Sequence, residues 1–95
     1  MNNSKVLITG GSSGIGKETA KQFIAKGAKV VITGRDETKL RHVASEIGAI
    51  PLFFDISDLQ SIPKKAKEVL ILLEGKVDVL VNNAGIGVFP VLGDI

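Results

Sequence analysis

Four glycines near the start of the chain have the spacing of a phosphate-binding loop. They follow an apolar stretch at residues 6–8 and precede a helical pattern; they are Gly10, Gly11, Gly14 and Gly16. Glycine lets the main chain approach a ligand closely and lets a helix pack tightly against a strand. The first N–H groups of a helix have no internal partners and carry the positive end of its dipole, so they suit a phosphate. This stretch therefore predicts a strand–turn–helix that binds a phosphate group, and a tight turn without a ligand is the alternative.

Two kinds of phosphate loop compete for this stretch. Residues 11–17 fit the pattern G-x-x-x-x-G-K of a P-loop, in which a Ser or Thr directly after the lysine binds magnesium. Glu18 holds that position here, and Thr19 comes one residue later, which turns its side chain by about 100° on a helix. A P-loop would therefore lack its metal ligand. A dinucleotide loop is favoured, and a P-loop nucleotide-binding protein is kept as the alternative.

The composition indicates one small domain over residues 1–95. Hydrophobic residues make up 44% of the chain, which is enough for a core, and the net charge is only +2. The charged residues form no dense Lys/Arg cluster, so we expect no nucleic-acid partner. No apolar stretch is long enough for a membrane span, and the absence of cysteine excludes disulfides and cysteine-based metal sites. We therefore expect a cytoplasmic protein without a metal centre.

Apolar stretches alternate with helical patterns along the chain. The expected strands cover residues 5–9, 29–33, 50–55 and 77–82. Short connections between parallel strands imply right-handed crossovers and an α/β fold with a Rossmann-type, doubly wound sheet, in the strand order 3-2-1-4. The carboxyl ends of strands 1 and 4 then flank one crevice, which is where open α/β sheets bind their ligands.

The helical segments carry the apolar stripes needed to cover such a sheet. Asp36 is the expected N-cap of the second helix, and Gly48 is its expected end. In the third helix, which should run continuously from about Pro63, Ile71 and Leu72 widen the apolar surface, either as extra cover for the core or as a contact with another chain. The residues expected to face the sheet from the first helix are Ile15, Ala20, Phe23 and Ile24.

Two segments resemble those of the short-chain dehydrogenase/reductase family. Residues 9–16, Thr-Gly-Gly-Ser-Ser-Gly-Ile-Gly, resemble the family's T-G-x-x-x-G-I-G segment, and residues 82–85, Asn-Asn-Ala-Gly, resemble its N-N-A-G segment at the expected distance downstream. The resemblance covers nearly the whole chain but only the amino-terminal part of the family's domain. It implies an incomplete Rossmann domain from an oxidoreductase that interconverts a ketone and a secondary alcohol by hydride transfer with a nicotinamide cofactor.

The resemblance also assigns residues of the glycine loop to the cofactor. The pyrophosphate is expected over this loop, with the backbone of Ile15 as a donor. Ser12 and Ser13 add hydroxyl groups near the adenosine ribose, or else they bond their own backbone as turn residues. The implied cofactor-binding residues of the loop are Gly10, Ser12, Ser13, Gly14, Ile15 and Gly16.

Residues that follow the third and fourth strands complete the implied site. Asp55 is expected to accept a hydrogen bond from the adenine amino group, with Ile56 beside the ring, and its alternative role is that of a turn residue. Asn82 resembles the asparagine that ties the end of strand 4 to its neighbours, while Ala84 and Gly85 line the ribose side. Because a buried amide needs specific partners, a structural role for Asn82 is as well supported as a ligand contact.

The segment Gly34-Arg35-Asp36 bears on the choice between NAD and NADP. An acidic residue about 20 residues past the glycines binds the ribose 2′-hydroxyl of NAD, and Asp36 lies at that distance from Gly16. In the family's pattern, however, the acid ends strand 2, where this chain has Gly34. Arg35 follows and resembles the NADP-preferring branch, since a guanidinium suits a 2′-phosphate. We therefore expect NADP, with Asp36 as a helix cap and NAD as the alternative.

The family's catalytic residues have no counterpart in this chain. They are a Tyr-x-x-x-Lys pair and a serine downstream of the N-N-A-G segment, and the tyrosine is the general acid/base. The chain has no tyrosine and ends soon after Gly85, so no catalytic residue is named. We expect the cofactor-binding half of a reductase, inactive alone, whose full-length parent acts on a small carbonyl or alcohol substrate. A non-catalytic nucleotide-binding or assembly module is the alternative.

The family's fifth strand is also missing, and this bears on assembly. In the family, strand 4 pairs with a neighbour on both sides, whereas this chain supplies no further strand. Residues 77–81 would then present an apolar edge with unpaired N–H and C=O groups. Because such an edge is a template for pairing with another chain, we expect a homo-oligomer.

Overall fold

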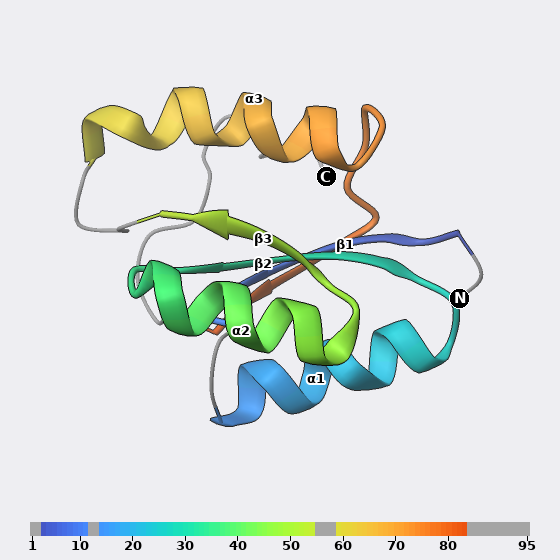
Figure 1. Cartoon of the computed structure of the whole chain (residues 1–95). Helices are drawn as coiled ribbons and strands as arrows, with labels where there is room; N and C mark the ends of the chain where they lie inside the picture. The colour runs from blue at the N-terminus through green and yellow to red at the C-terminus, as the bar shows by residue number, and fades with distance from the viewer. Residues whose placement is uncertain (1–2, 12–13, 55–58, 84–95) are drawn as a thin grey trace.

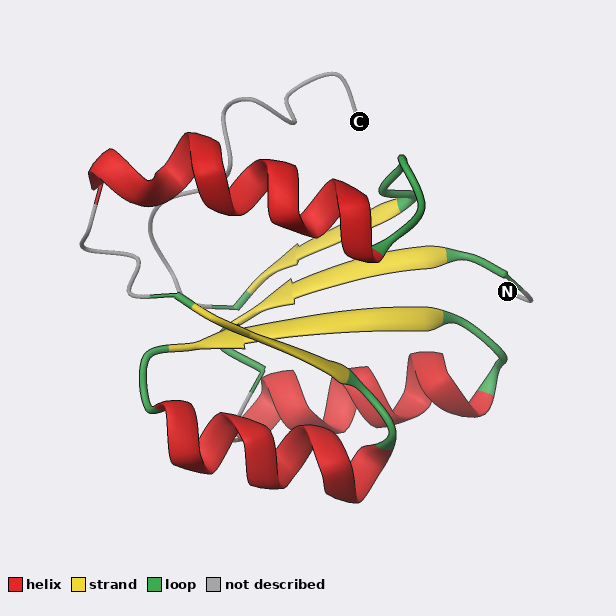
Figure 2. Ribbon diagram, turned by 45° about the horizontal axis from the view of Figure 1, so that its top comes forward, coloured by secondary structure: helices red, strands yellow, loops and turns green. Residues whose placement is uncertain are grey.

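A four-stranded parallel sheet lies between two layers of helices. The computed structural model describes residues 3–11, 14–54 and 59–83. Within these residues, α1 and α2 cover one face of the sheet and α3 covers the other (Figure 1, Figure 2). In chain order the elements are β1 (Lys5–Thr9), α1 (Gly14–Ala25), β2 (Lys29–Gly34), α2 (Glu37–Ile47), β3 (Ile50–Phe53), a 3₁₀ turn (Leu59–Ser61), α3 (Ile62–Leu72) and β4 (Val79–Asn82).

The strand order is β3-β2-β1-β4 with every pair parallel, which confirms the predicted order and fold class. All four strands therefore end on the same side of the molecule, to which the arrowheads in Figure 2 point. On that side Thr9 of β1 lies opposite Asn82 of β4. The register thus places the ends of β1 and β4 next to each other, as the predicted crevice requires.

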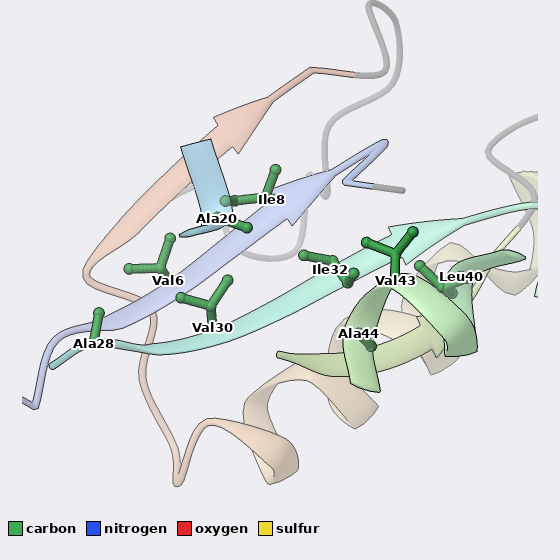
Figure 3. Close-up of a cluster of buried hydrophobic side chains, with 9 residues drawn as sticks. All are labelled: Val6, Ile8, Ala20, Ala28, Val30, Ile32, Leu40, Val43 and Ala44. Atoms are coloured by element: carbon green, nitrogen blue, oxygen red, sulfur yellow. The ribbon is translucent and has the colours of Figure 1, made fainter. Parts of the chain in front are cut away.

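Side chains of the two central strands are buried on both faces of the sheet. In β1, Leu7 belongs to the core beneath α3, whereas Val6 and Ile8 belong to the core beneath α1 and α2. Burial on both faces explains why these strands are continuous apolar runs, with no alternation of apolar and polar residues. Figure 3 shows the core beneath α1 and α2, which consists of Val6, Ile8, Ala20, Ala28, Val30, Ile32, Leu40, Val43 and Ala44.

The ends of α2 are those that its sequence predicts. The carboxylate of Asp36 accepts the N–H of Lys39 at 3.1 Å and so caps the helix, because that N–H has no partner within the helix. Gly48 ends the helix with a φ of +83°, and its N–H donates to the carbonyl oxygen of Ala44 at 2.8 Å. Both signals are local, since a cap and its partner lie within one helical turn.

α3 begins at Ile62, directly after the 3₁₀ turn and close to the predicted start at Pro63. Pro63 falls in the first helical turn, where its missing N–H costs no hydrogen bond. Ser57 and Gln60 fit a capping-box pattern in the sequence, and Ser57 lies outside the described residues. Leu72 packs against the core beneath α3, whereas Ile71 is 76% exposed, so only Leu72 serves as extra cover.

The predicted inward face of α1 is wrong at Ile15. This side chain is 77% exposed, and the buried residues of the helix are Gly16 and Ala20. The buried stripe starts at a glycine because the first turn lies too close to the loop after β1 to admit a side chain. Phe23 and Ile24 are half-buried and pack on the core, as predicted.

Two strands are shorter than predicted. β3 ends at Phe53, and its predicted last residue, Asp55, lies outside the described residues. β4 begins at Val79, two residues later than predicted. Asp78 just before it is bonded to Lys5 twice: its N–H donates to the carbonyl oxygen of Lys5 at 2.7 Å, and its Oδ2 accepts the N–H of Lys5 at 2.7 Å. No helix in the described part of the chain has the length and apolar character that a bilayer crossing needs.

Candidate functional site

The loop after β1 is fastened to the end of β2 by its backbone. The N–H of Gly10 donates to Thr33 Oγ1 at 3.3 Å, and the N–H of Gly11 donates to the carbonyl oxygen of Thr33 at 3.0 Å. Gly11 is buried, and a Cβ on it would lie 2.6 Å from the Cβ of Ile32, closer than real side chains approach. Thr33 was not predicted as a site residue. The only indication in the sequence is that it carries a hydroxyl group near the end of an apolar strand.

α1 begins with a turn that requires glycine at two positions. Gly14 has a φ of +57°, in the left-handed region. Gly16 is buried, and a Cβ on it would overlap the carbonyl oxygen of Gly10 and lie 2.7 Å from Asn83 Nδ2. The first turn of the helix contains no acidic residue. Its N–H groups without helical partners and the positive end of the helix dipole therefore suit an anion.

Two asparagines tie the end of β4 to β1 and its loop. The hydroxyl of Thr9 donates to Asn82 Oδ1 at 2.9 Å, and Asn83 Nδ2 donates to the carbonyl oxygen of Gly10 at 3.0 Å. Asn82 thus makes a contact between the ends of β1 and β4, which is one of the two roles expected for it. Asn83 was not singled out as a site residue, although it is the second asparagine of the N-N-A-G segment and was available as a signal.

The turn between β2 and α2 contains one arginine that is free of described partners. Arg35 is exposed and has no hydrogen bond or ion pair with any residue in the described ranges. Asp36 beside it is engaged as the N-cap of α2. Arg41, one turn into the helix, is held by Glu37 through contacts of 3.1 Å from Nε and 2.7 Å from Nη2. In the part of the chain that the structure describes, the guanidinium of Arg41 therefore has a partner and that of Arg35 has none.

The structure brings part of the predicted site together. At the carboxyl ends of β1 and β4 it places Gly10, Gly14, Ile15, Gly16 and Asn82, with Ile15 exposed. Arg35 lies at the end of the neighbouring β2, to which the glycine loop is bonded. The remaining predicted residues lie outside the described ranges; they are Ser12, Ser13, Asp55, Ile56, Ala84 and Gly85.

A group of charged residues gathers at the opposite end of the sheet, away from this site. Glu74 Oε1 accepts hydrogen bonds from Lys29 Nζ at 3.0 Å and from Lys5 Nζ at 3.2 Å, so one carboxylate joins the starts of β1 and β2. These hydrogen bonds, from Lys29 first and then Lys5, lower the pKa of Glu74. Glu74 itself has a φ of +64°, an uncommon conformation for a residue other than glycine. Its ion pairs contribute to the fold and lie outside the candidate site.

The chain is similar to known proteins along most of its length. A family model described as short chain dehydrogenase matches residues 4–94. The chain is 44% identical over 92 residues to "Dehydrogenase/reductase SDR family member 7B" of Xenopus laevis, and the match covers 85% of this chain and 28% of that protein. It is 41% identical to "Uncharacterized short-chain type dehydrogenase/reductase y4eK" of Sinorhizobium fredii, where the match covers 90% of this chain and 33% of that protein.

Solved structures show the same likeness. The structure described as 3-ketoacyl-(acyl-carrier-protein) reductase from Brucella melitensis complexed with NADH has a TM-score of 0.80 and 44% sequence identity with this chain. The match covers 90% of this chain and 36% of that protein. The chain therefore spans about a third of the length of these proteins. These matches favour the dinucleotide loop over the P-loop.

Proposed function

The chain belongs to the short-chain dehydrogenase family, and from this premise we propose that it forms the NADP(H)-binding part of an oxidoreductase. The full-length protein would interconvert a small ketone and a secondary alcohol. The nicotinamide cofactor, when bound, supplies or accepts the hydride. The residues of this chain hold the dinucleotide, and the carbonyl chemistry is left to residues outside it.

The observation that carries the proposal is the close approach of α1 to the glycine loop. A Cβ on Gly16 would fill the space between the helix start and Gly10, so this position has room only for backbone. Backbone N–H groups with no helical partner are the donors that a pyrophosphate requires. Asn83, which follows β4, and Thr33 of β2 hold Gly10, the residue against which the start of α1 packs, so the loop beside these donors is positioned before a ligand arrives.

The guanidinium of Arg35, which has no partner among the described residues, supports NADP over NAD. A 2′-phosphate adds negative charge to the adenosine ribose, and an arginine binds phosphate through charge-assisted hydrogen bonds. Asp36, the residue that could instead accept the 2′-hydroxyl of NAD, is occupied as a helix cap. The Brucella melitensis reductase was solved with NADH, so NAD remains the alternative cofactor.

Substitution of Arg35 tests this choice. A hydrogen bond to a charged group contributes about 1.5–3 kcal/mol, so the unmodified chain should bind NADPH about 10- to 100-fold more tightly than NADH. Arg35→Ala should remove most of this preference and leave the NADH affinity unchanged. Arg41→Ala is the matched control, because it removes an equal charge that Glu37 already neutralises. Equal affinities in the unmodified chain would contradict NADP and assign Asp36 to the ribose.

We also propose that the chain alone catalyses no hydride transfer. It contains no tyrosine, the residue that serves as general acid in the family it belongs to. Purified chain with NADPH and a panel of small ketones should therefore oxidise NADPH no faster than the background. Turnover above the background would contradict the proposal.

Self-association through β4 is a further part of the proposal. Within the described residues β4 pairs only with β1, so one side of β4 has no neighbouring strand. Its three apolar residues, Val79, Leu80 and Val81, are only partly buried. An unpaired apolar edge favours pairing with a second chain. Sedimentation at micromolar concentration should show a species larger than the 10.0 kDa monomer, and a stable monomer would refute this part.

A further inference from the structure

The first turn of α1 has little of its own to hold it in place. Two of its residues, Gly14 and Gly16, are glycines, each of which weakens a helix by up to about 1 kcal/mol relative to alanine. Ile15 between them is 77% exposed, so it contributes little packing. This turn nevertheless supplies the N–H groups on which the proposed phosphate site depends. Contacts from elsewhere in the molecule must therefore order it.

Lys17 makes one such contact, to a different helix. Its Nζ lies 2.6 Å from Oε1 of Glu46, so an ion pair joins the first turn of α1 to the last turn of α2. The two helices lie side by side on the same face of the sheet (Figure 1, Figure 2). The Lys17 side chain is 33% exposed and that of Glu46 is 49% exposed. The pair therefore bridges the two helices at the edge of the buried core.

Each partner is unfavourably placed on its own helix. Lys17 adds positive charge near the positive end of the α1 dipole, and Glu46 adds negative charge near the negative end of the α2 dipole. The ion pair offsets both placements at once. The hydrogen bond and the charge of Lys17 lower the pKa of Glu46, and the charges of His42 and Lys21 lower it further, so the carboxylate is ionised at neutral pH.

We propose that Glu46 is a positioning residue for the phosphate site: through Lys17 it holds the first turn of α1 in the geometry that binds the dinucleotide. Glu46 lies in a different helix and does not belong to the glycine loop. That the ligand is a dinucleotide rests on the proposed function. That Glu46 orders the first turn of α1 does not depend on the proposed function. The ion pair directs Lys17 toward α2. In a P-loop the corresponding lysine contacts the phosphates, so this contact also distinguishes the loop from a P-loop.

Glu46→Ala gives a sharp test because two effects on affinity have opposite signs. Removal of a negative charge from the surface raises the affinity for an anionic cofactor. Loss of the ion pair to Lys17 lowers that affinity, since part of the binding energy must then order the turn. Weaker NADPH binding by Glu46→Ala would therefore be opposite in sign to the charge effect, as a positioning role requires. An exposed ion pair contributes modestly, so we expect an affinity about two- to fivefold lower.

Glu18→Ala is the matched control. Glu18 follows Lys17 directly and pairs only with Lys21 of its own helix among the described residues, at 3.7 Å. Its removal changes the charge near the site equally but breaks no contact between helices. NADPH affinity in this variant should stay the same or rise. A fall equal to that of Glu46→Ala would overturn the proposal, as would unchanged or higher affinity in Glu46→Ala.

Amide exchange in the free chain gives a second measurement that needs no cofactor. The N–H of Thr19 bonds to the carbonyl of Ile15 in a helix, so its exchange reports the opening of the first turn. Glu46→Ala should speed the exchange of the Thr19 amide about two- to fivefold, and Lys17→Met should speed it by the same factor. The double variant should exchange no faster than either single variant, because both substitutions break the same ion pair. The Ile24 amide, in the second half of α1, is the internal control. Unchanged exchange at Thr19 in either variant would overturn the proposal.

The two measurements separate this proposal from the proposed function. If the unmodified chain fails to bind NADPH while Thr19 exchange responds to Glu46→Ala, the proposed function is wrong and the ordering of the turn is upheld. If NADPH binds and Thr19 exchange does not respond, the positioning role of Glu46 is wrong and the proposed function is upheld.

Discussion

Gly16→Ala is the smallest change that should damage the site, because it adds one methyl group where α1 meets the glycine loop. In the structure this Cβ would overlap the carbonyl oxygen of Gly10, and it would lie 2.7 Å from Asn83 Nδ2 and 3.1 Å from Gly11 Cα. Ordinary contact begins at 3.4 Å, so relief of the Asn83 contact alone requires a movement of 0.7 Å. The helix start, the loop or the asparagine must therefore shift.

The net effect on stability is a balance of two terms. Overpacking of this kind costs about 1–3 kcal/mol, and replacement of glycine by alanine in a helix returns about 0.5–1 kcal/mol. We expect Gly16→Ala to lower the free energy of unfolding by about 1–2 kcal/mol. The effect on binding should be larger, since N–H groups displaced by this much lose charge-assisted hydrogen bonds to phosphate. Loss of one such bond corresponds to at least about a tenfold weaker NADPH affinity.

Urea unfolding and NADPH titration of the same preparations measure both quantities. Gly14→Ala is the comparison variant, because its Cβ would meet no atom within 4 Å and only its φ of +57° is unfavourable. It should lose stability through backbone strain while the helix keeps its approach to the loop. If Gly16→Ala unfolds at the same urea concentration as the parent and binds NADPH equally well, the close approach that carries the proposed site does not exist.

Two further predictions concern the cap of α2 and the ion pairs at the far end of the sheet. Asp36→Ala should lower stability by about 1 kcal/mol through loss of the cap and leave the ratio of NADPH to NADH affinity unchanged; a selective loss of NADH affinity would assign Asp36 to the ribose instead. Because bonds from Lys29 and Lys5 lower the pKa of Glu74, its contribution to stability is complete above the ordinary value of 4.5 and is lost as pH falls below it. Urea unfolding at neutral and at acidic pH should therefore show a smaller acid-induced loss in Glu74→Gln than in the parent, and equal losses would contradict this role.

Local signals in the sequence were sufficient for most of the fold. The cap at Asp36, the end of α2 at Gly48 and the apolar runs of the central strands each depend on residues close together in the chain. The strand order followed from the handedness of short crossovers. The position of the site followed in turn, since the ends of β1 and β4 are neighbours in that order.

The contacts that fasten the site could not be predicted from local signals. Asn83 donates to the carbonyl oxygen of Gly10, and Lys17 pairs with Glu46. The partners in each pair are far apart in the sequence, so the spacing of residues along a helix or strand does not indicate them. Ile15 was wrongly expected to face the sheet, because its spacing fits an apolar stripe. Tertiary packing decided otherwise, since the helix start lies so close to the loop that glycine alone fits the buried position.

The central claim is that the start of α1 binds the phosphates of a dinucleotide, and a titration of ¹⁵N-labelled chain with NADPH followed by NMR tests it most directly. The largest amide shifts should occur at Gly10 and at residues 14–16, with a further shift at Arg35 that NADH does not produce. Saturating NADPH that leaves these amides unmoved, or that shifts chiefly residues of β3 and α3, would contradict the account.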